Sequence, residues 1–280
     1  MMELTARYSL EFNPFLKNSK EILYAGSEYK EALFRLDYLA RTKGFGLLTG
    51  APGRGKTTLV RNWCKKLNPS LYKVIYTSLS TVTVNDFYRN LAVSLGAPAA
   101  YRKTENFHAI QDEITRLAMD KKKTPVIIID EANYVSNAVL NDLKILFNFE
   151  MDSRDRAVIL LVGLPQLNNT LRLTIHEPLR QRIIMNYNLD GLTKEEGREY
   201  ISRKLEGAGC HQVLFMNDRI LVPCLFLDRM MIFNTDLEYQ GSVVFPDGTG
   251  PRHGVFSNDE STLYLISELS NELSIDVSVL

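Results

Sequence analysis

An eight-residue run near position 50, together with the threonine after it, has the composition of a phosphate-binding loop. It matches the pattern GxxxxGK[ST] in full and comprises Gly50, Ala51, Pro52, Gly53, Arg54, Gly55, Lys56 and Thr57, followed by Thr58. Glycines at this spacing let successive backbone N–H groups converge on a phosphate, and the start of the following helix adds a positive dipole end. We expect Lys56 to neutralise the β- and γ-phosphates of a nucleotide, and the Thr57 hydroxyl to bind Mg²⁺.

Two acids follow an aliphatic run further along the chain. Residues 126–129 are all valine or isoleucine and lead directly into Asp130 and Glu131. The carboxyl end of such a buried parallel strand is where α/β folds bind ligands. We expect Asp130 to hold Mg²⁺ through water and Glu131 to act as the base that polarises the attacking water. Together, loop and acids predict an enzyme that binds ATP and Mg²⁺ and hydrolyses ATP.

Other polar residues near the ends of the remaining strands are candidates for contacting the γ-phosphate. Arg180 and Arg182 precede the last predicted strand. We expect Arg182 to act as an arginine finger on a neighbouring subunit's nucleotide, the alternative being that both arginines are surface ion-pair partners. Gln166 is the weaker candidate for contacting the γ-phosphate or the lytic water. Thr77 and Ser78, at the end of the second predicted strand, are candidates for restraining the catalytic acid.

Hydrophobic periodicity predicts the elements that must position these residues. Helical spacing of apolar residues predicts helices at 28–42, 57–67, 84–95, 106–121, 137–150 and 193–206, the last opened by a capping box of Thr193 and Glu196. Short apolar runs predict strands at 45–49, 73–78, 126–130, 157–162 and 183–189. This alternation indicates a parallel α/β sheet. Beyond residue 209 the pattern weakens, with strand-like runs at 243–245 and 255–256 and a helix-like run at 262–273.

Charge is divided unevenly along the chain. The 33 basic and 33 acidic residues balance, but residues 205–280 hold three arginines, no lysine and eleven acids. That segment therefore carries a net charge of −8, and residues 1–204 carry +8. A basic body favours a polyanion such as double-stranded DNA, contacted through its phosphates without regard to sequence. The candidate contacts are Arg102, Lys103 and residues 121–123; the alternative is that these are solvated helix ends and loops.

Composition excludes several classes of protein. Hydrophobic residues make up 45% and charged residues 24% of the 280, which are ordinary globular values. Three scattered cysteines are too few for a disulfide framework or a zinc site. The N-terminus lacks the apolar core of a signal peptide, and no apolar run approaches the ~20 residues that span a bilayer. We therefore expect a cytoplasmic protein with no membrane partner.

Several of these motifs occur together in the order typical of one family. The segments GAPGRGKTTL, IIIDEAN, ILLVGLPQL, PLRQRI and GLTKEEGREYISRKLEGAG resemble the ExeA-type AAA+ ATPases over about residues 8–210. That group includes the general secretion pathway protein A ATPases and the TniB-like and MuB-like accessory ATPases of bacterial transposons. The resemblance implies a P-loop fold of the AAA+ (ASCE) type, with a parallel five-stranded sheet flanked by helices. It also implies a homo-oligomer with nucleotide between subunits, the finger at Arg182, and residues 12–15 and 22–27 on the adenine side.

The chain departs from this family after its lid begins. Family members continue into a helical lid with a Gly-x-Pro-Arg-like sensor-2 motif, to which residues 248–252 bear only a weak likeness. Leu164 stands where the family often has a glutamine, and Tyr29 where it often has a histidine. We predict a nucleotide-binding α/β domain at residues 1–190. Residues 191–280 are expected to form a lid start and a divergent acidic region, with the last ~65 residues a divergent, fused or frame-shifted tail.

Three functions follow from these features. The first is a transposition accessory ATPase that assembles on target DNA and recruits or stimulates a transposase; the +8 body and the lack of a membrane segment favour it. The alternative is an ExeA-like secretion-pathway ATPase, a group whose members carry a membrane anchor and a peptidoglycan-binding part. A third is a nucleotide-dependent regulatory switch with a protein partner. Stimulation of hydrolysis by DNA separates the first from the other two.

Overall fold

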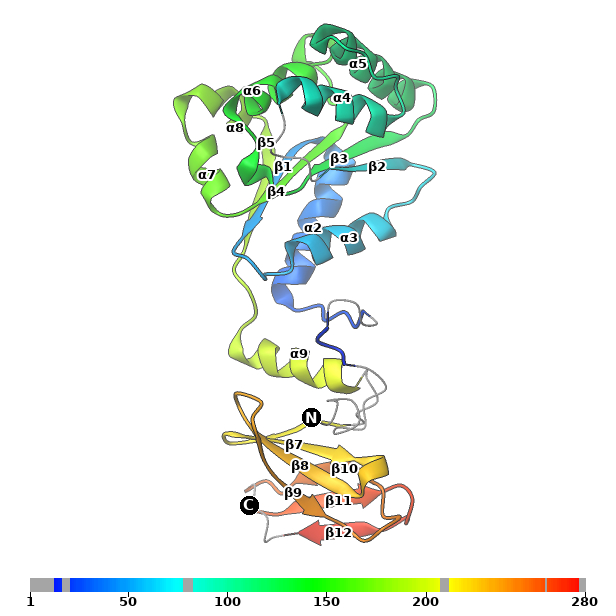
Figure 1. The fold of residues 1–280 in the computed structure, drawn as a ribbon, viewed down its shortest axis with the longest axis vertical. Coiled ribbons are helices and arrows are strands. Elements are labelled where there is room, and N and C mark those ends of the chain that lie inside the picture. The colour runs from blue at the N-terminus through cyan, green and yellow to red at the C-terminus, as the bar shows by residue number, and fades with distance from the viewer. Residues whose placement is uncertain (1–12, 17–20, 78–82, 207–211, 260, 277–280) are drawn as a thin grey trace. The chain divides into compact units, whose positions relative to one another are not determined.

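The computed structural model describes residues 13–16, 21–77, 83–206, 212–259 and 261–276 and divides the chain into two compact units (Figure 1). One unit comprises Ala25–Gly191, and the other comprises Met1–Tyr24 together with Leu192–Leu280. The sequence placed residues 1–190 in one domain, whereas the described residues before Ala25 group with the C-terminal unit. Of the residues expected on the adenine side, 13–15 and 22–24 therefore belong to that unit, 25–27 belong to the Ala25–Gly191 unit, and Phe12 lies outside the described residues.

A sheet of five parallel strands forms the centre of the Ala25–Gly191 unit. Its order is β2-β3-β4-β1-β5, so β4 lies between the strand before the phosphate loop and the strand before the acid pair. This confirms the predicted parallel five-stranded sheet. The strands are β1 (Gly44–Gly50), β2 (Tyr72–Thr77), β3 (Thr124–Ile129), β4 (Val158–Gly163) and β5 (Ile183–Leu189).

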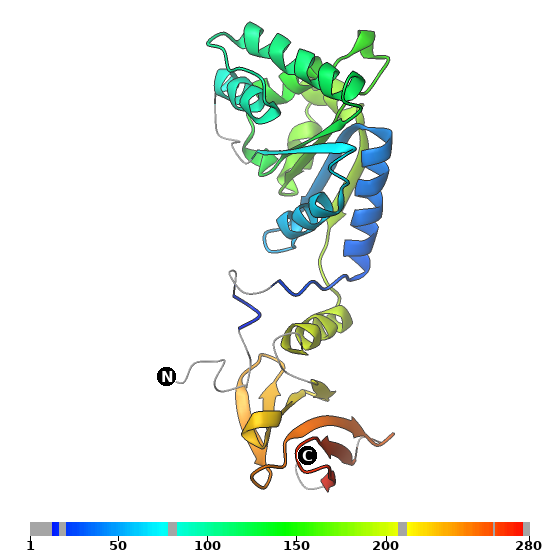
Figure 2. The same ribbon diagram turned by 90° about the vertical axis from the view of Figure 1, so that its right-hand side faces the viewer.

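Helices cover both faces of this sheet (Figure 2). Val126 and Ile128 pack in a cluster with α2 (Ser27–Thr42) and α3 (Lys56–Lys66). Ile127 and Ile129 point the other way, into a cluster with the helices of the opposite face. Burial on both faces explains why the strand before the acid pair is uniformly aliphatic. The opposite face carries α4 (Val84–Leu95), α5 (Lys103–Met119) and α6 (Asn137–Leu146); shorter helices are η1 (Ala132–Tyr134), α7 (Gln166–Leu171), η3 (Thr174–His176) and α8 (Glu177–Arg180).

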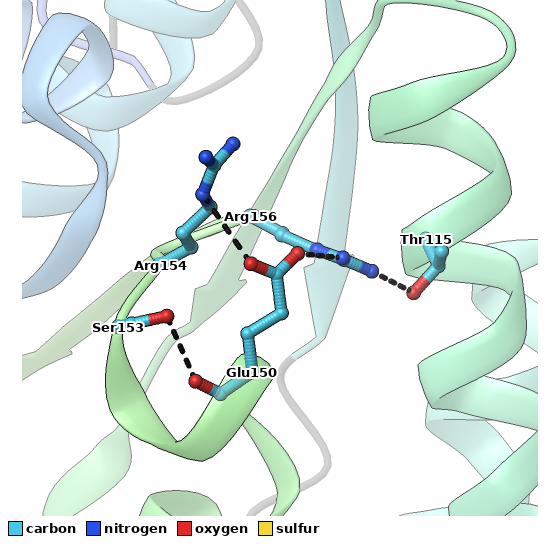
Figure 3. Close-up of polar contacts among 5 residues, drawn as sticks. All are labelled: Thr115, Glu150, Ser153, Arg154 and Arg156. Atoms are coloured by element: carbon cyan, nitrogen blue, oxygen red, sulfur yellow. Dashed lines mark hydrogen bonds and ion pairs between the residues drawn. The ribbon is translucent and has the colours of Figure 1, made fainter.

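An ion-pair cluster fixes the turn that leads from α6 into β4 (Figure 3). Glu150 opens the short helix η2 (Glu150–Asp152), and its carboxylate pairs with Arg156 and, at 3.3 Å, with the Nε of Arg154. Arg156 also donates to the Thr115 hydroxyl on α5 at 2.6 Å. The Ser153 hydroxyl closes the turn by donating to the Glu150 carbonyl at 2.8 Å. These contacts tie the start of β4 to the neighbouring helix.

The C-terminal unit begins with a helix and continues as antiparallel strands. Helix α9 (Lys194–Glu206) opens with the predicted capping box, in which the Thr193 and Glu196 backbone N–H groups each donate to the other's side chain at 3.1 Å. A four-stranded sheet follows, formed by β6 (Leu214–Met216), β7 (Arg219–Cys224), β8 (Arg229–Asn234) and β9 (Tyr239–Val244), with η4 (Leu225–Leu227) in between. A three-stranded sheet comprises β10 (Pro251–Phe256), β11 (Leu263–Ser267) and β12 (Leu273–Asp276).

The two antiparallel sheets share a hydrophobic cluster. Leu221 and Met230 of the first sheet pack with Leu263 of the second. Asp228, between β7 and β8, accepts hydrogen bonds from the backbone N–H groups of Gly248 (2.8 Å) and Gly250 (2.7 Å), just before β10. These bonds hold the pKa of the Asp228 carboxyl below its ordinary value.

The helix predicted at residues 262–273 is wrong. Leu263, Leu265 and Ser267 are buried while Tyr264 and Ile266 are exposed, which is the two-residue period of a strand. The apolar residues of this segment also fall near helical spacing, so the sequence pattern indicates a helix where the chain forms a strand.

The weak likeness of residues 248–252 to a sensor-2 motif has no helical counterpart either. Arg252 lies in β10 and pairs with Glu268 at 2.5 Å. Within the described residues 212–259 and 261–276, strands and the short helix η4 occupy the place where the family has a helical lid.

Candidate nucleotide-binding site

The phosphate loop connects β1 to α3 through two glycines with left-handed backbone. Gly53 has φ +76° and Gly55, the N-cap of α3, has φ +82°. A Cβ built on either glycine would meet no atom within 4 Å, so backbone conformation, not crowding, requires glycine here. The open space beside both leaves room for a phosphate to approach the backbone.

Lys56 begins α3 and lies across the loop. Its Nζ donates to the carbonyls of Gly50 (2.7 Å) and Ala51 (3.0 Å), which holds the cation where phosphates would bind. Pro52 is exposed at the loop tip, and Thr58 is half-buried in the first turn of the helix.

Arg54 packs against the last residue of the same unit. A Cβ built on Gly191 would lie 2.0 Å from the Arg54 guanidinium, so that side chain covers the glycine. The carboxylate of Glu28, in α2, also contacts this end of β5: it accepts from the backbone N–H groups of Asp190 (2.7 Å) and Gly191 (3.3 Å). The loop arginine therefore lies at the end of β5, a placement that the motif alone did not predict.

Asp130 brings the two expected metal ligands together. Its side chain is 4% exposed, and its Oδ2 accepts from the Thr57 hydroxyl at 3.1 Å, across 73 positions of sequence. The same oxygen accepts from the Tyr76 hydroxyl at 2.8 Å. The other oxygen, Oδ1, accepts from the Glu131 backbone N–H at 2.9 Å. A hydroxyl and a carboxylate so placed are oxygen ligands of the kind that Mg²⁺ prefers.

Tyr76 is a site residue that sequence reasoning missed. It stands beside Ile128 in the β2–β3 register, so its side chain lies on the same face as Asp130, two residues further along. Burial, with the hydrogen bond to Asp130, raises the pKa of the Tyr76 hydroxyl to about 12. No local sequence pattern marks Tyr76, because it reaches the site only through the pairing of β2 with β3. The backbone carbonyl of Thr77 accepts from the Asp130 N–H at 2.9 Å, and Ser78 lies outside the described residues.

Glu131 follows Asp130 in a left-handed conformation. Its φ of +53° and ψ of +36° are uncommon for a residue with a side chain and cost on the order of 1–3 kcal/mol. The residue is exposed, unlike its buried neighbour. Backbone outliers of this kind cluster at functional sites, and this one sends two adjacent acids in different directions.

Helix α7 carries the predicted Gln166 and a second polar residue, Asn168, that sequence reasoning did not name. Gln166 is exposed at its first position. Asn168, two residues further on, donates to the buried hydroxyl of Thr49 at 3.1 Å, and that hydroxyl donates to Asn188 of β5 at 2.9 Å. Since Thr49 directly precedes Gly50, Asn168 is the α7 side chain linked to the base of the phosphate loop.

The two arginines before β5 differ in their surroundings. Arg182 is half-buried and donates from its guanidinium to the Lys144 carbonyl, in the last turn of α6, at 2.8 Å. Arg180 is exposed, with only a 3.5 Å contact to Glu177. Both lie in the Ala25–Gly191 unit.

The groups present fit a nucleoside triphosphate with Mg²⁺. The loop offers a lysine cation, left-handed glycines and a helix start, and Thr57 with Asp130 offers two adjacent oxygens. Among the described residues there is no group of three or more histidine, cysteine, aspartate or glutamate side chains that would hold a metal alone. A divalent ion here would need phosphate oxygens to complete its coordination, as Mg²⁺ on a nucleotide does.

This fold and site define a P-loop ATPase domain of the AAA+ class. The family model of the AAA domain matches residues 39–171. The structure of Cdc6p from Pyrobaculum aerophilum superposes with a TM-score of 0.52 at 16% identity, covering 73% of this chain and 54% of that one. At that identity the likeness shows the fold alone.

The chain is also similar to General secretion pathway protein A of Aeromonas hydrophila, with 32% identity over 218 residues. The match covers 75% of this chain but only 39% of that relative. Together with the AAA domain, it confirms the resemblance to the ExeA-type AAA+ ATPases.

The C-terminal part is similar to a different protein. The model of the lactonase family, described as a seven-bladed β-propeller, matches residues 186–277. A 6-phosphogluconolactonase of Serratia proteamaculans is 35% identical over 65 residues, which are 21% of this chain and 20% of that enzyme. The antiparallel sheets that follow α9 thus lie in a segment that is similar to a protein outside the ATPase family. The described residues include no helix long and apolar enough to cross a membrane.

Proposed function

We propose that this chain binds ATP with Mg²⁺ and hydrolyses it at the carboxyl edge of its parallel sheet. The observation that carries the proposal is the meeting of Thr57 and Asp130 beside Lys56 and the phosphate loop. Because such a site needs a supply of ATP, we place the domain on the cytoplasmic side.

The residues divide the work between binding and proton transfer. Loop N–H groups and Lys56 bind the β- and γ-phosphates, while Thr57 and Asp130 hold Mg²⁺, which would neutralise charge on the phosphate oxygens. Glu131 orients the attacking water and accepts its proton. Arg182 serves as the finger toward a neighbouring copy, and Gln166 as a contact to the γ-phosphate side.

The relative whose sequence is similar over 75% of this chain favours a secretion-type role. We propose that ATP turnover drives a protein assembly of the secretion-pathway kind. The partner would then be protein, and hydrolysis would not depend on nucleic acid.

A second candidate is the transposition accessory role, with double-stranded DNA and a transposase as partners. The net charge of +8 on residues 1–204 favours it. Its candidate contacts are partly engaged within the chain, since Lys103 pairs with Asp142 at 2.5 Å and Lys123 donates to the Pro69 carbonyl at 2.8 Å. Arg102, Lys121 and Lys122 are exposed.

The test is ATP turnover with and without double-stranded DNA, at low and moderate salt. The secretion-type proposal predicts turnover that DNA does not raise. Stimulation by DNA that falls steeply with salt would instead establish the second candidate, because phosphate contacts release counterions. Lys56→Ala is the control, since it should remove nucleotide binding and turnover under every condition.

A further inference from the structure

The central strand β4 ends beside the phosphate loop without a polar side chain of its own. Its last residue is Gly163, which a leucine and a proline follow. Gly163 pairs in register with Thr49 of β1, directly before the loop. On the other side of β4, Ile129 pairs with Leu161, so the acid pair follows at the level of the end of β4. This strand end therefore lies between the loop and the acids.

Asn133 supplies a polar group at this place, from the short helix η1 just after the acid pair. Its Oδ1 accepts from the backbone N–H of Leu164 at 3.1 Å. A Cβ built on Gly163 would lie 2.9 Å from that oxygen and 3.2 Å from the Asn133 backbone nitrogen. Any larger residue at the end of β4 would force the asparagine to shift, so the glycine makes room for it.

The hydrogen bond to Leu164 determines which end of the Asn133 amide is available to a ligand. A backbone N–H can only donate, so the amide atom that faces it is the oxygen and the other is the nitrogen. This nitrogen, Nδ2, donates to no residue that the structure describes. The side chain is half-buried, so it is neither enclosed by protein nor fully hydrated. The chain thus holds an oriented donor at the edge of the sheet that carries the phosphate loop.

We propose that Asn133 is a further residue of the nucleotide site, whose Nδ2 donates to the γ-phosphate of bound ATP. The inference rests on the proposed function and adds to it a residue that distinguishes ATP from ADP, because ADP lacks this phosphate. A donor fixed before the reaction stabilises the charge that develops on the transferred phosphoryl group.

Two other amide side chains near the end of β4 lack this combination of orientation and availability. Asn168 is engaged at both ends, since its Nδ2 donates to Thr49 at 3.1 Å and its Oδ1 accepts from Asn186 at 3.4 Å. Gln166 is exposed, and no described residue hydrogen-bonds its side chain. Gln166 can add a contact once nucleotide is bound, but Asn133 is the amide that the protein orients in advance.

The experiment is calorimetric titration of the full chain with Mg²⁺ and either ADP or AMP-PNP, a non-hydrolysable ATP analogue. Asn133→Asp keeps the size of the side chain and an oxygen for the Leu164 N–H, but replaces the donor with a second oxygen. Asn133→Ala removes the donor without adding a charge. Both variants should bind AMP-PNP at least about tenfold more weakly than wild type, and ADP within about threefold of it, because only the analogue loses a hydrogen bond to a charged group.

ATP turnover and a matched substitution complete the measurement. Both Asn133 variants should turn over ATP about 10²-fold more slowly than wild type. Asn169→Asp is the control, because it makes the same change of amide to carboxylate at an exposed position of α7. It should leave both affinities and the turnover unchanged. Circular dichroism and thermal unfolding verify that each variant is folded.

A purely structural role for Asn133 predicts a different result. If the side chain only holds Leu164, Asn133→Asp should behave as wild type, since its carboxylate accepts the same hydrogen bond. That result, or an equal loss of AMP-PNP and ADP binding, would overturn the inference while leaving the proposed ATPase in place. A wild type that binds neither nucleotide would overturn the proposed function, and this inference with it.

Discussion

At the scale of single residues, the site is organised around one buried carboxylate. Asp130 accepts hydrogen bonds at both oxygens, from Thr57 and Tyr76 at one and from the Glu131 N–H at the other. Bonds to a carboxylate are stronger than neutral ones and leave it little freedom to rotate. The protein therefore holds this carboxylate in one orientation beside the Thr57 hydroxyl.

The substitution Tyr76→Phe tests the hydrogen bond from Tyr76 to Asp130 through the pH dependence of the protein's stability. The folded-state pKa of Tyr76 is raised to about 12 from an ordinary value of 10. A raised pKa contributes stability that is complete below pH 10 and is lost as pH rises toward 12. Wild type should therefore lose more stability than Tyr76→Phe between pH 10 and 12, measured by urea denaturation. Equal losses in the two proteins would show that the hydroxyl does not depend on Asp130.

A subunit-mixing experiment distinguishes whether Arg182 or Arg180 is the arginine finger. If Arg182 is the finger, Arg182→Ala should lose at least about 10³-fold in turnover while still binding ATP. Mixing it with Glu131→Gln subunits should restore part of the activity, because some interfaces then pair an intact Arg182 with an intact Glu131. A larger loss in Arg180→Ala, whose side chain is exposed, would reassign the role.

Sequence alone identified the residues whose spacing is fixed by chemistry. The phosphate loop and the acid pair are short, contiguous patterns, and the structure brings Thr57 to Asp130. Tyr76 and Asn168 reach the site only through strand register and helix placement, so no local pattern marks them. Gln166 and Arg182 remain proposals that rest on motif order.

At the scale of elements, alternation and burial explain which predictions held. Strands β1, β3 and β4 are apolar and almost wholly buried, and all five strands of the parallel sheet occur where predicted to within two residues at each end. The segment at 262–273 is short and lies on a sheet with both faces apolar, so periodicity could not separate helix from strand.

The turn before β4 offers a matched pair of substitutions. Arg154 and Arg156 both pair with Glu150, but the Arg156 side chain is 15% exposed and that of Arg154 is 70% exposed. Arg156→Ala should lower the free energy of unfolding by about 1–3 kcal/mol, since it removes charged hydrogen bonds to Glu150 and Thr115. Arg154→Ala should cost no more than about 0.5 kcal/mol. Thermal and urea denaturation measure both, and equal losses would contradict this account of the cluster.

At the scale of the whole molecule, the chain contains two units with their own cores. Both faces of the parallel sheet are buried within Ala25–Gly191, and separate clusters lie in the antiparallel sheets. Their different relatives, an AAA domain and a lactonase, fit this division. In the sequence, this division is visible as the change from a basic to an acidic segment near residue 205. The similarity of the second unit to a lactonase was found only by comparison with known families.

Calorimetry should resolve these units as two transitions. ATP with Mg²⁺ at about 100 times its dissociation constant should stabilise the AAA+ unit alone, by about 2.7 kcal/mol. The other transition should not move, and Lys56→Ala should abolish the shift. A single transition that nucleotide raises as a whole would contradict independent cores.

The most direct test of the central claim compares wild type with Glu131→Gln in ATP binding and ATP turnover. Glutamine keeps the size of the side chain and its hydrogen bonding but cannot accept the proton from water. The account predicts that Glu131→Gln binds ATP as tightly as wild type while turnover falls at least about 100-fold. Turnover that survives the substitution, or a wild type that binds ATP and never hydrolyses it, would contradict catalysis by Glu131 at this site.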